Sequence, residues 1–313
     1  MRSERNKEGA NMSLTHRIGV AWRLVRPFTL SASVAPVLVG TGMAIPVHPF
    51  RGDLFVCFLL ASLLIQAATN MLNEYFDYKR GLDSEAMVGI AGTIVRDGVE
   101  PRTVLRSAWL SMAVAIALGV YICAETSWWI ALVGLACMAV AYLYSGGPKP
   151  LSSTPFGELA AAVSMGPVIV LLAYFIQTRH LDAPVVWVSV PVGLFIGAIL
   201  LGNNIRDMEL DRAGGRRTVP IVLGRARATA LFAAVFCVAY AMLVTLVACA
   251  AITPFALAVL LTAPTAWYVA KRFFEHKEPS KLHPAVKGTA TLLFRVSAIL
   301  FVAQVLPVWI HTV

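Results

Sequence analysis

The sequence predicts an all-α integral membrane protein. Three observations support this fold class: the composition, the long apolar runs and the placement of the charges. Of the 313 residues, 58% are hydrophobic and only 14% are charged, and the mean hydropathy is +0.73. Soluble domains have about 25% charged residues and about 45–50% apolar ones. The composition therefore excludes an ordinary soluble enzyme.

About nine apolar runs are long enough to cross ~30 Å of hydrocarbon as helices. In chain order they are 28–47, 54–77, 104–123, 127–144, 157–178, 183–205, 227–249, 252–271 and 287–311. These runs account for most of the chain and leave no room for a separate soluble domain. We therefore expect one polytopic membrane domain over residues 21–313, after a loose cytoplasmic segment over residues 1–20.

The net charge of +9 is distributed unevenly between the two sides of the predicted membrane domain. Lys and Arg concentrate before the first run and in the connections 78–103, 206–226 and 272–286, whereas the connections on the other side hold only Arg51 and Arg179. Basic residues stay on the cytoplasmic side of a membrane. We therefore expect a multi-pass protein of the cell membrane, with the N-terminus and the long loops in the cytoplasm. The basic excess indicates topology rather than a nucleic-acid partner.

Two acidic segments, at the ends of the second and sixth apolar runs, repeat the spacing Asn-x-x-x-Asp. Asn73 precedes Asp77, and Asn203 precedes Asp207. Residues four apart lie on one face of a helix, one turn from each other. The repetition also hints at two related halves of the chain.

A further acid follows each pair. Asp211 extends the second face by one more turn, whereas Asp83 follows Gly81 and is expected just past the helix end, near the same site. Amide and carboxylate oxygens without thiols or imidazoles suit a hard cation such as Mg²⁺, which binds one or two carboxylates together with substrate phosphates. Two such faces opposite each other would hold a metal-bridged diphosphate.

Charged residues also end many membrane helices at the headgroup level without any binding role. Here, however, about half of the 17 acidic residues lie in or just after the two motifs. An unpaired charged side chain at membrane depth costs ~2.5–3.5 kcal/mol. The matched acidic faces therefore favour a binding site over solvated helix ends.

With these residues the sequence resembles the UbiA superfamily of intramembrane prenyltransferases, which carry two aspartate-rich motifs at the cytoplasmic ends of helices two and six. It is most similar to the menaquinone branch, which attaches a polyprenyl chain to 1,4-dihydroxy-2-naphthoate. The resemblance is carried by Arg26–Leu30, Asn73–Asp83, Tyr144–Pro148 and Asn203–Thr218. Two positions depart from the family pattern: Glu74 stands where most relatives have Asp, and Phe28 where Lys is frequent.

The resemblance implies nine helices around a central cavity capped by cytoplasmic loops. It implies Mg²⁺ as cofactor, a polyprenyl diphosphate donor and a small aromatic acceptor, in contact with membrane lipid. The implied metal ligands are Asn73, Asp77, Asp83, Asn203, Asp207 and Asp211, with Asp77, Asp207 and Asp211 as the catalytic residues. The implied diphosphate contact is Arg206, helped by Lys79, Arg80, Lys149 and Arg212. The candidates for facing the allylic cation or the acceptor ring are Tyr75, Tyr142 and Tyr144.

Two other functions remain open from the sequence. The same scaffold could prenylate 4-hydroxybenzoate, haem, a chlorophyllide or a glycerol phosphate, or could cyclise a terpene. A secondary transporter would need broken helices and ionisable groups near the bilayer centre. The apolar runs are almost free of charge except for Arg295, and the acids cluster at one interface, which disfavours transport.

Overall fold

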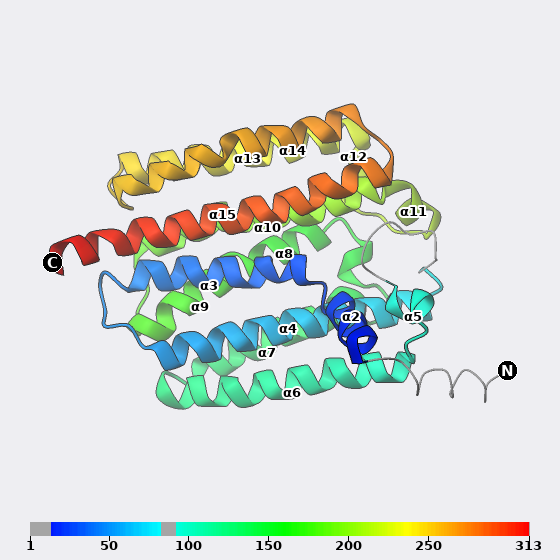
Figure 1. Cartoon of the computed structure of the whole chain (residues 1–313), viewed down its shortest axis with the longest axis horizontal. Coiled ribbons are helices and arrows are strands. Elements are labelled where there is room, and N and C mark those ends of the chain that lie inside the picture. Colours follow the sequence, from blue (N-terminus) through cyan, green and yellow to red (C-terminus); the bar gives the residue numbers. More distant parts are fainter. Residues whose placement is uncertain (1–13, 83–91, 313) are drawn as a thin grey trace.

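The computed structural model describes residues 14–82 and 92–312, and all regular secondary structure in this part of the chain is helical. The longer helices are α2 (Leu14–Val25), α3 (Ser31–Ala44), α4 (Gly52–Lys79), α6 (Pro101–Glu125), α7 (Trp129–Ser145), α8 (Gly157–Met165), α9 (Pro167–Thr178), α10 (Ala183–Arg206), α13 (Arg225–Ala248), α14 (Ala263–Glu275) and α15 (Pro279–Thr312). The short ones are η1 (Pro27–Leu30), α5 (Thr93–Arg96), η2 (Leu151–Ser153), α11 (Met208–Ala213), α12 (Val219–Leu223) and η3 (Pro254–Thr262). The long helices run alongside one another in a single bundle (Figure 1).

Seven segments of the described chain are long and apolar enough to cross a membrane. Two further predicted spans are present in other forms: α7 is an apolar helix of only 17 residues, and η3 leads into α14 at Thr262. The predicted all-α membrane fold of about nine helices is thus confirmed. Residues 1–13 of the predicted loose segment 1–20 lie outside the described residues. The rest of that segment is not loose, because helix α2 begins at Leu14.

Large apolar side chains cover the outside of the bundle. Leu132, Leu261 and Trp267 expose 71%, 81% and 72% of their surface. Inside, α10, α13 and α14 meet around Phe195, Phe232 and Phe273, all of them buried. An apolar outer surface of this extent needs an apolar surrounding, and the bundle is accordingly a multi-pass membrane protein.

The predicted run 157–178 is divided into two helices. The division falls at Gly166 and Pro167, and Pro167 has no N–H to continue the helical hydrogen bonds. A Cβ added at Gly166 would lie 2.3 Å from the Cα of Gly193 on α10. The glycine therefore lets two backbones touch where α8 ends and α9 begins.

Helix α2 and the short helices α5, α11 and α12 gather at one end of the bundle, which we call the motif end (Figure 1). Helix α4 reaches this end without interruption, and Gly81, at φ +69°, follows its last turn. The predicted helix end before Asp83 is confirmed, but Asp83 itself lies outside the described residues. Both acidic motifs are found at the motif end.

The second acidic motif differs from its prediction. We expected one unbroken helical face over Asn203, Asp207 and Asp211, but α10 ends at Arg206 and α11 begins at Met208. Across the break, Asp207 N–H donates to Asn203 O at 2.9 Å and Asp211 N–H to Asp207 O at 2.9 Å. The chain bends at Asp207, yet the contacts between residues four apart persist.

A stability measurement tests the close approach at Gly166. Gly166→Ala should lower the free energy of unfolding by about 1–3 kcal/mol, because the added methyl group overlaps the backbone of α10. Gly119→Ala is the matched control, because nothing lies within 4 Å of a Cβ added there. Thermal unfolding of the detergent-solubilised proteins measures both changes. Equal melting temperatures for the two variants would contradict the close contact between Gly166 and α10.

Candidate active site

A cavity of about 340 Å³ opens among α3, α4, α7, α8 and α10 and is lined by residues of both acidic motifs. Asn73 and Asp77 line it from α4, and Asn203 and Asp207 line it from the end of α10. The rest of the lining includes apolar side chains: Phe58, Ile65, Leu172, Ile196 and Ile199. The charged lining residues and the motif asparagines form one end of the cavity, at the motif end of the bundle, which we call its mouth. The rest of the lining is mainly apolar, with a few polar side chains such as Ser62, Gln66 and Ser164.

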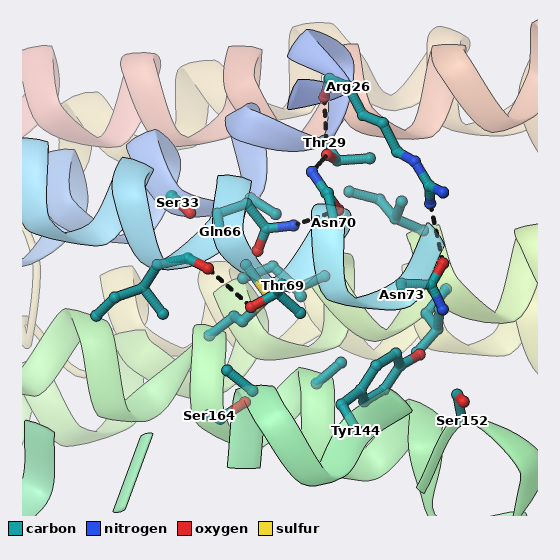
Figure 2. Close-up of a pocket in the computed structure, with 18 of the residues that line it drawn as sticks. Arg26, Thr29, Ser33, Gln66, Thr69, Asn70, Asn73, Tyr144, Ser152 and Ser164 are labelled. Atoms are coloured by element: carbon teal, nitrogen blue, oxygen red, sulfur yellow. Dashed lines mark hydrogen bonds between the residues drawn. The ribbon is translucent and has the colours of Figure 1, made fainter. Parts of the chain in front are cut away.

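The segment before α3 folds onto the polar face of α4. Asn70 donates through Nδ2 to Val25 O at 2.8 Å and to Thr29 Oγ1 at 2.9 Å. Arg26 adopts left-handed backbone angles, φ 55° and ψ 69°, which are uncommon for a side chain with a Cβ. Its Nη1 donates to Asn73 Oδ1 at 3.2 Å, as Figure 2 shows. The turn thus places a guanidinium at the cavity.

The first motif has the geometry expected of one helix face. Asn73 Nδ2 donates to Asp77 Oδ2 at 3.3 Å, one turn further along α4, and to Ser145 Oγ at 3.1 Å. Ser145 is the last residue of α7 and is fully buried. The Asn73 side chain is therefore fixed between Arg26, Asp77 and Ser145 at the mouth of the cavity.

Arg216 joins the two acidic motifs. Its Nη2 lies 2.7 Å from Asp77 Oδ1, and its Nη1 lies 3.0 Å from Asp211 Oδ1. The Asp77 and Asp211 side chains are each 9% exposed, and that of Arg216 is 15% exposed. Two carboxylates that are distant in sequence thus face one another across a single guanidinium.

Burial changes the protonation chemistry of this cluster. Removal from water raises the pKa of Asp211 to about 6, although the positive charge of Arg216 opposes the shift. Burial by itself would lower the pKa of Arg216, but the carboxylates of Asp77 and Asp211 outweigh it, so the net shift is upward. Arg216 therefore remains a cation, and Asp211 ionises less readily than a solvated aspartate.

Asp207 is paired with its own neighbour. Arg206 donates to it twice, from Nε to Oδ1 at 2.7 Å and from Nη2 to Oδ2 at 2.5 Å. The Nη1 of Arg206 lies 3.2 Å from His283 Nδ1 on α15. All three residues line the cavity. The arginine predicted to contact diphosphate is thus present at the cavity, where its fork-shaped donor group suits a phosphate as well as a carboxylate.

The donors at the cavity mouth fit Mg²⁺ bound together with a substrate, rather than Mg²⁺ in a closed protein cage. Among the described residues, no three His, Cys, Asp or Glu side chains come close enough to hold a metal by themselves. A side-chain cation does bridge Asp77 and Asp211, so carboxylates from both motifs can share one positive charge. Mg²⁺ commonly takes one or two carboxylates and completes its shell with phosphate and water oxygens.

The structure does not bring every predicted residue to the cavity. The four helper cations are exposed and outside its lining: Lys79, Arg80, Lys149 and Arg212. Arg80 donates to Gly147 O at 3.0 Å, and Arg212 pairs with Glu209 at 3.0 Å. Of the three tyrosines, Tyr144 lines the cavity (Figure 2).

Tyr75 and Tyr142 belong to an aromatic cluster instead. The ring centroids of Tyr75 and Phe76 are 5.3 Å apart, and those of Phe76 and Tyr142 are 5.7 Å apart. Trp109 on α6 extends the cluster, with its ring 6.1 Å from that of Tyr142. These two tyrosines pack α4, α6 and α7 together.

Sequence reasoning missed two buried carboxylates that organise the site. Glu158, at the start of α8, accepts hydrogen bonds from Asn204 Nδ2 at 2.8 Å and from Val219 N–H at 3.2 Å. Its signal in the sequence was a lone acid at the edge of an apolar run. By bonding both sides of the second motif, Glu158 ties that motif to α8.

Glu74 differs from Asn73 and Asp77 because its side chain bonds to helix α5 and does not line the cavity. It is fully buried and accepts hydrogen bonds from Thr93 Oγ1 and, at 3.0 Å, from Ile94 N–H. These contacts attach α5 to α4, and Arg96 at the end of α5 lines the cavity. The Glu74 side chain thus anchors α5 beside the cavity.

Known proteins share both the sequence pattern and the fold. The chain is 47% identical to a 1,4-dihydroxy-2-naphthoate octaprenyltransferase of Bacillus subtilis, over 87% of each chain. It is 31% identical to the enzyme of that name from Mycobacterium tuberculosis, over 84% of this chain and 89% of the relative. A solved UbiA homolog from Archaeoglobus fulgidus, bound to DMAPP and Mg²⁺, has the same fold at a TM-score of 0.63 and 16% identity, covering 90% of this chain and 98% of that one.

The family assignment rests on nearly the whole membrane domain. Residues 33–303 match the UbiA prenyltransferase family, a range that includes both acidic motifs, Arg216 and most of the cavity lining. The chain belongs to the UbiA prenyltransferase family.

Proposed function

We propose that this protein transfers a polyprenyl chain from its diphosphate to the aromatic ring of 1,4-dihydroxy-2-naphthoate. The observation that carries the proposal is the meeting of two acidic motifs at the mouth of one apolar cavity. The acceptor is inferred from the naphthoate octaprenyltransferases that the chain resembles.

The two ends of the cavity match the two ends of a prenyl diphosphate. The donor tail would lie along Phe58, Ile65 and Leu172, where each CH₂ group is about 0.8 kcal/mol more stable than in water. The diphosphate would lie at the polar mouth, within reach of the guanidiniums of Arg26 and Arg206. One cavity can therefore hold an amphipathic donor in a single orientation.

Mg²⁺ would be held by oxygen donors that line the cavity, Asn73, Asp77, Asn203 and Asp207, and by Asp211, which adjoins the lining through its ion pair with Arg216. When bound, the ion supplies positive charge that stabilises the leaving diphosphate. Arg206 would add two donor groups to the same phosphate oxygens after separating from Asp207. These residues act where negative charge develops, which is the contribution that lowers a barrier.

The remaining chemistry takes place beside the mouth. The C–O bond of the donor would break toward an allylic cation, with diphosphate as the leaving group, and an electron-rich ring carbon of the acceptor would attack that cation. The attacked carbon then releases its own substituent, as H⁺ or as CO₂ from a carboxylate, and the ring becomes aromatic again. Tyr144 lines the cavity below α4 (Figure 2), and its ring would stabilise the cation through its electron-rich face. The apolar lining keeps out water, which would otherwise capture the cation.

An acceptor panel tests the proposed function. Membranes containing the protein should convert 1,4-dihydroxy-2-naphthoate to a prenylated product when Mg²⁺ and a polyprenyl diphosphate are supplied, as measured by mass spectrometry. The competing acceptors are 4-hydroxybenzoate and a glycerol phosphate, and chelation of Mg²⁺ is the control. Prenylation of a competing acceptor, but not of the naphthoate, would refute the assigned acceptor.

Substitution of the motif aspartates tests the metal assignment. Asp77→Asn and Asp207→Asn should each lower prenyl transfer per folded protein by about 100-fold or more, because an amide carries no charge for Mg²⁺. Each exchange also removes a partner from an arginine, so we expect some loss of thermal stability as well.

Glu209→Gln is the matched control for these variants. Glu209 lies on α11 beside the site, but its side chain is 67% exposed and pairs with Arg212. This variant should keep near-normal transfer. Normal transfer by Asp77→Asn or Asp207→Asn at saturating Mg²⁺ would show that the metal is held elsewhere.

We also propose that the motif end faces the cytoplasm and that the membrane is the cell membrane. The support is the concentration of Lys and Arg in the connections 78–103, 206–226 and 272–286. In a chain without native cysteines, Ala213→Cys at the motif end and Leu181→Cys at the opposite end are both exposed positions. A membrane-impermeant thiol reagent added to intact cells should label Leu181→Cys alone. Labelling of Ala213→Cys alone would reverse the orientation.

A further inference from the structure

Arg216 occupies the position between the two acidic motifs where a bound cation would lie. It contacts one oxygen of Asp77 and one of Asp211, at 2.7 and 3.0 Å. Its Nε is buried without a hydrogen-bond partner. The guanidinium thus contacts two carboxylates and keeps one buried N–H group, at Nε, without an acceptor. Arg216 also lines the cavity.

The backbone conformation places Arg216, and not the adjacent Arg217, between the two acidic motifs. Gly215 has a φ of +75°, and Arg216 N–H donates to Asp211 O at 2.9 Å. The turn therefore directs Arg216 back to the motif. Arg217 is exposed, and its backbone N–H donates instead to Ser153 O at 2.9 Å.

We propose that Arg216 is a built-in cation that joins the two acidic motifs while the site is empty, and that a diphosphate draws it away so that Mg²⁺ can bind there. The proposal rests on the function proposed above. It adds that Mg²⁺ binding is conditional on the diphosphate, because the arginine competes for the same carboxylate oxygens.

Charge balance explains why the exchange depends on the diphosphate. Asp77, Asp211 and Arg216 together carry one net negative charge, and Mg²⁺ alone would have to displace a guanidinium that already has two short contacts. The displaced guanidinium would be left buried beside a new cation, which is unfavourable. A diphosphate supplies acceptors that a guanidinium binds through two parallel hydrogen bonds, including the unused Nε donor.

Titration calorimetry on the full-length, detergent-solubilised protein tests this exchange without any turnover. Arg216→Gln should bind Mg²⁺ alone at least roughly tenfold to a hundredfold more tightly than the native protein, because neither of the two charge-assisted contacts of the guanidinium then competes with the metal. Arg217→Gln is the matched control, because it removes the neighbouring exposed charge and should leave the Mg²⁺ affinity as in the native protein.

Inorganic pyrophosphate provides the second half of the experiment. In the native protein it should increase the affinity for Mg²⁺, and by linkage Mg²⁺ should increase the affinity for pyrophosphate by the same factor. In Arg216→Gln this mutual increase in affinity should be smaller, because Mg²⁺ can then bind the carboxylates without first displacing an arginine.

If Arg216→Gln folds too poorly for calorimetry, the effect of Mg²⁺ on its melting temperature tests the same proposal. In a chelator this variant should melt below the native protein, and Mg²⁺ should raise its melting temperature more than that of the native protein. Arg216→Lys keeps the charge but cannot bridge two carboxylates with a planar fork. Its Mg²⁺ affinity should lie between those of Arg216→Gln and the native protein.

Two results overturn the proposal in distinguishable ways. If the native protein binds Mg²⁺ with pyrophosphate and transfers prenyl groups, but Arg216→Gln and Arg216→Lys bind Mg²⁺ no more tightly than it does, Arg216 is not a competing cation. If the native protein binds no Mg²⁺ even with pyrophosphate and transfers no prenyl group, the proposed function fails together with this inference.

Discussion

The ion pairs of Arg216 with Asp77 and Asp211 are the contacts on which the motif end depends. Burying two carboxylates in the wall of an apolar bundle is costly unless a cation accompanies them. Arg216 supplies that cation, with each of the three side chains no more than 15% exposed. Because α4 and α11 contribute one carboxylate each, the same contacts also join the two acidic motifs across the cavity.

Other buried polar contacts hold the surroundings of this cluster in place. Glu158 attaches α8 to the second motif through Asn204 and Val219, and Glu74 attaches α5 to α4. Both acids accept hydrogen bonds from backbone and side-chain donors at once, so each fixes a segment rather than a single residue. The result is a polar mouth with defined walls above an apolar cavity, an arrangement that suits a substrate with a charged head and a long hydrocarbon tail.

The membrane fold and the first motif could be predicted from the sequence because both depend on local periodicity. Long apolar runs specify helices in lipid, and the spacing of Asn73 and Asp77 places them on one face of α4, where Asn73 Nδ2 indeed reaches Asp77. The division of residues 157–178 was not predicted, because the run was identified by hydropathy, which does not count the backbone hydrogen bond that Pro167 cannot make. The bend at Asp207 was missed for a similar reason, since residue spacing does not report where a helix ends.

A bundle of membrane helices with two acidic motifs follows from the amino-acid sequence alone, since composition, run length and spacing are properties of neighbouring residues. Which charged residues meet depends instead on how the helices pack. Lys79, Arg80, Lys149 and Arg212 carry a positive side chain as Arg216 does, yet they stay exposed, while Arg216 reaches Asp77 from a distant loop. Likewise Tyr144 lines the cavity, whereas Tyr75 and Tyr142 pack between helices. The physical reason is that a side chain's environment is set by which helices pack together, and that packing joins residues far apart in the chain.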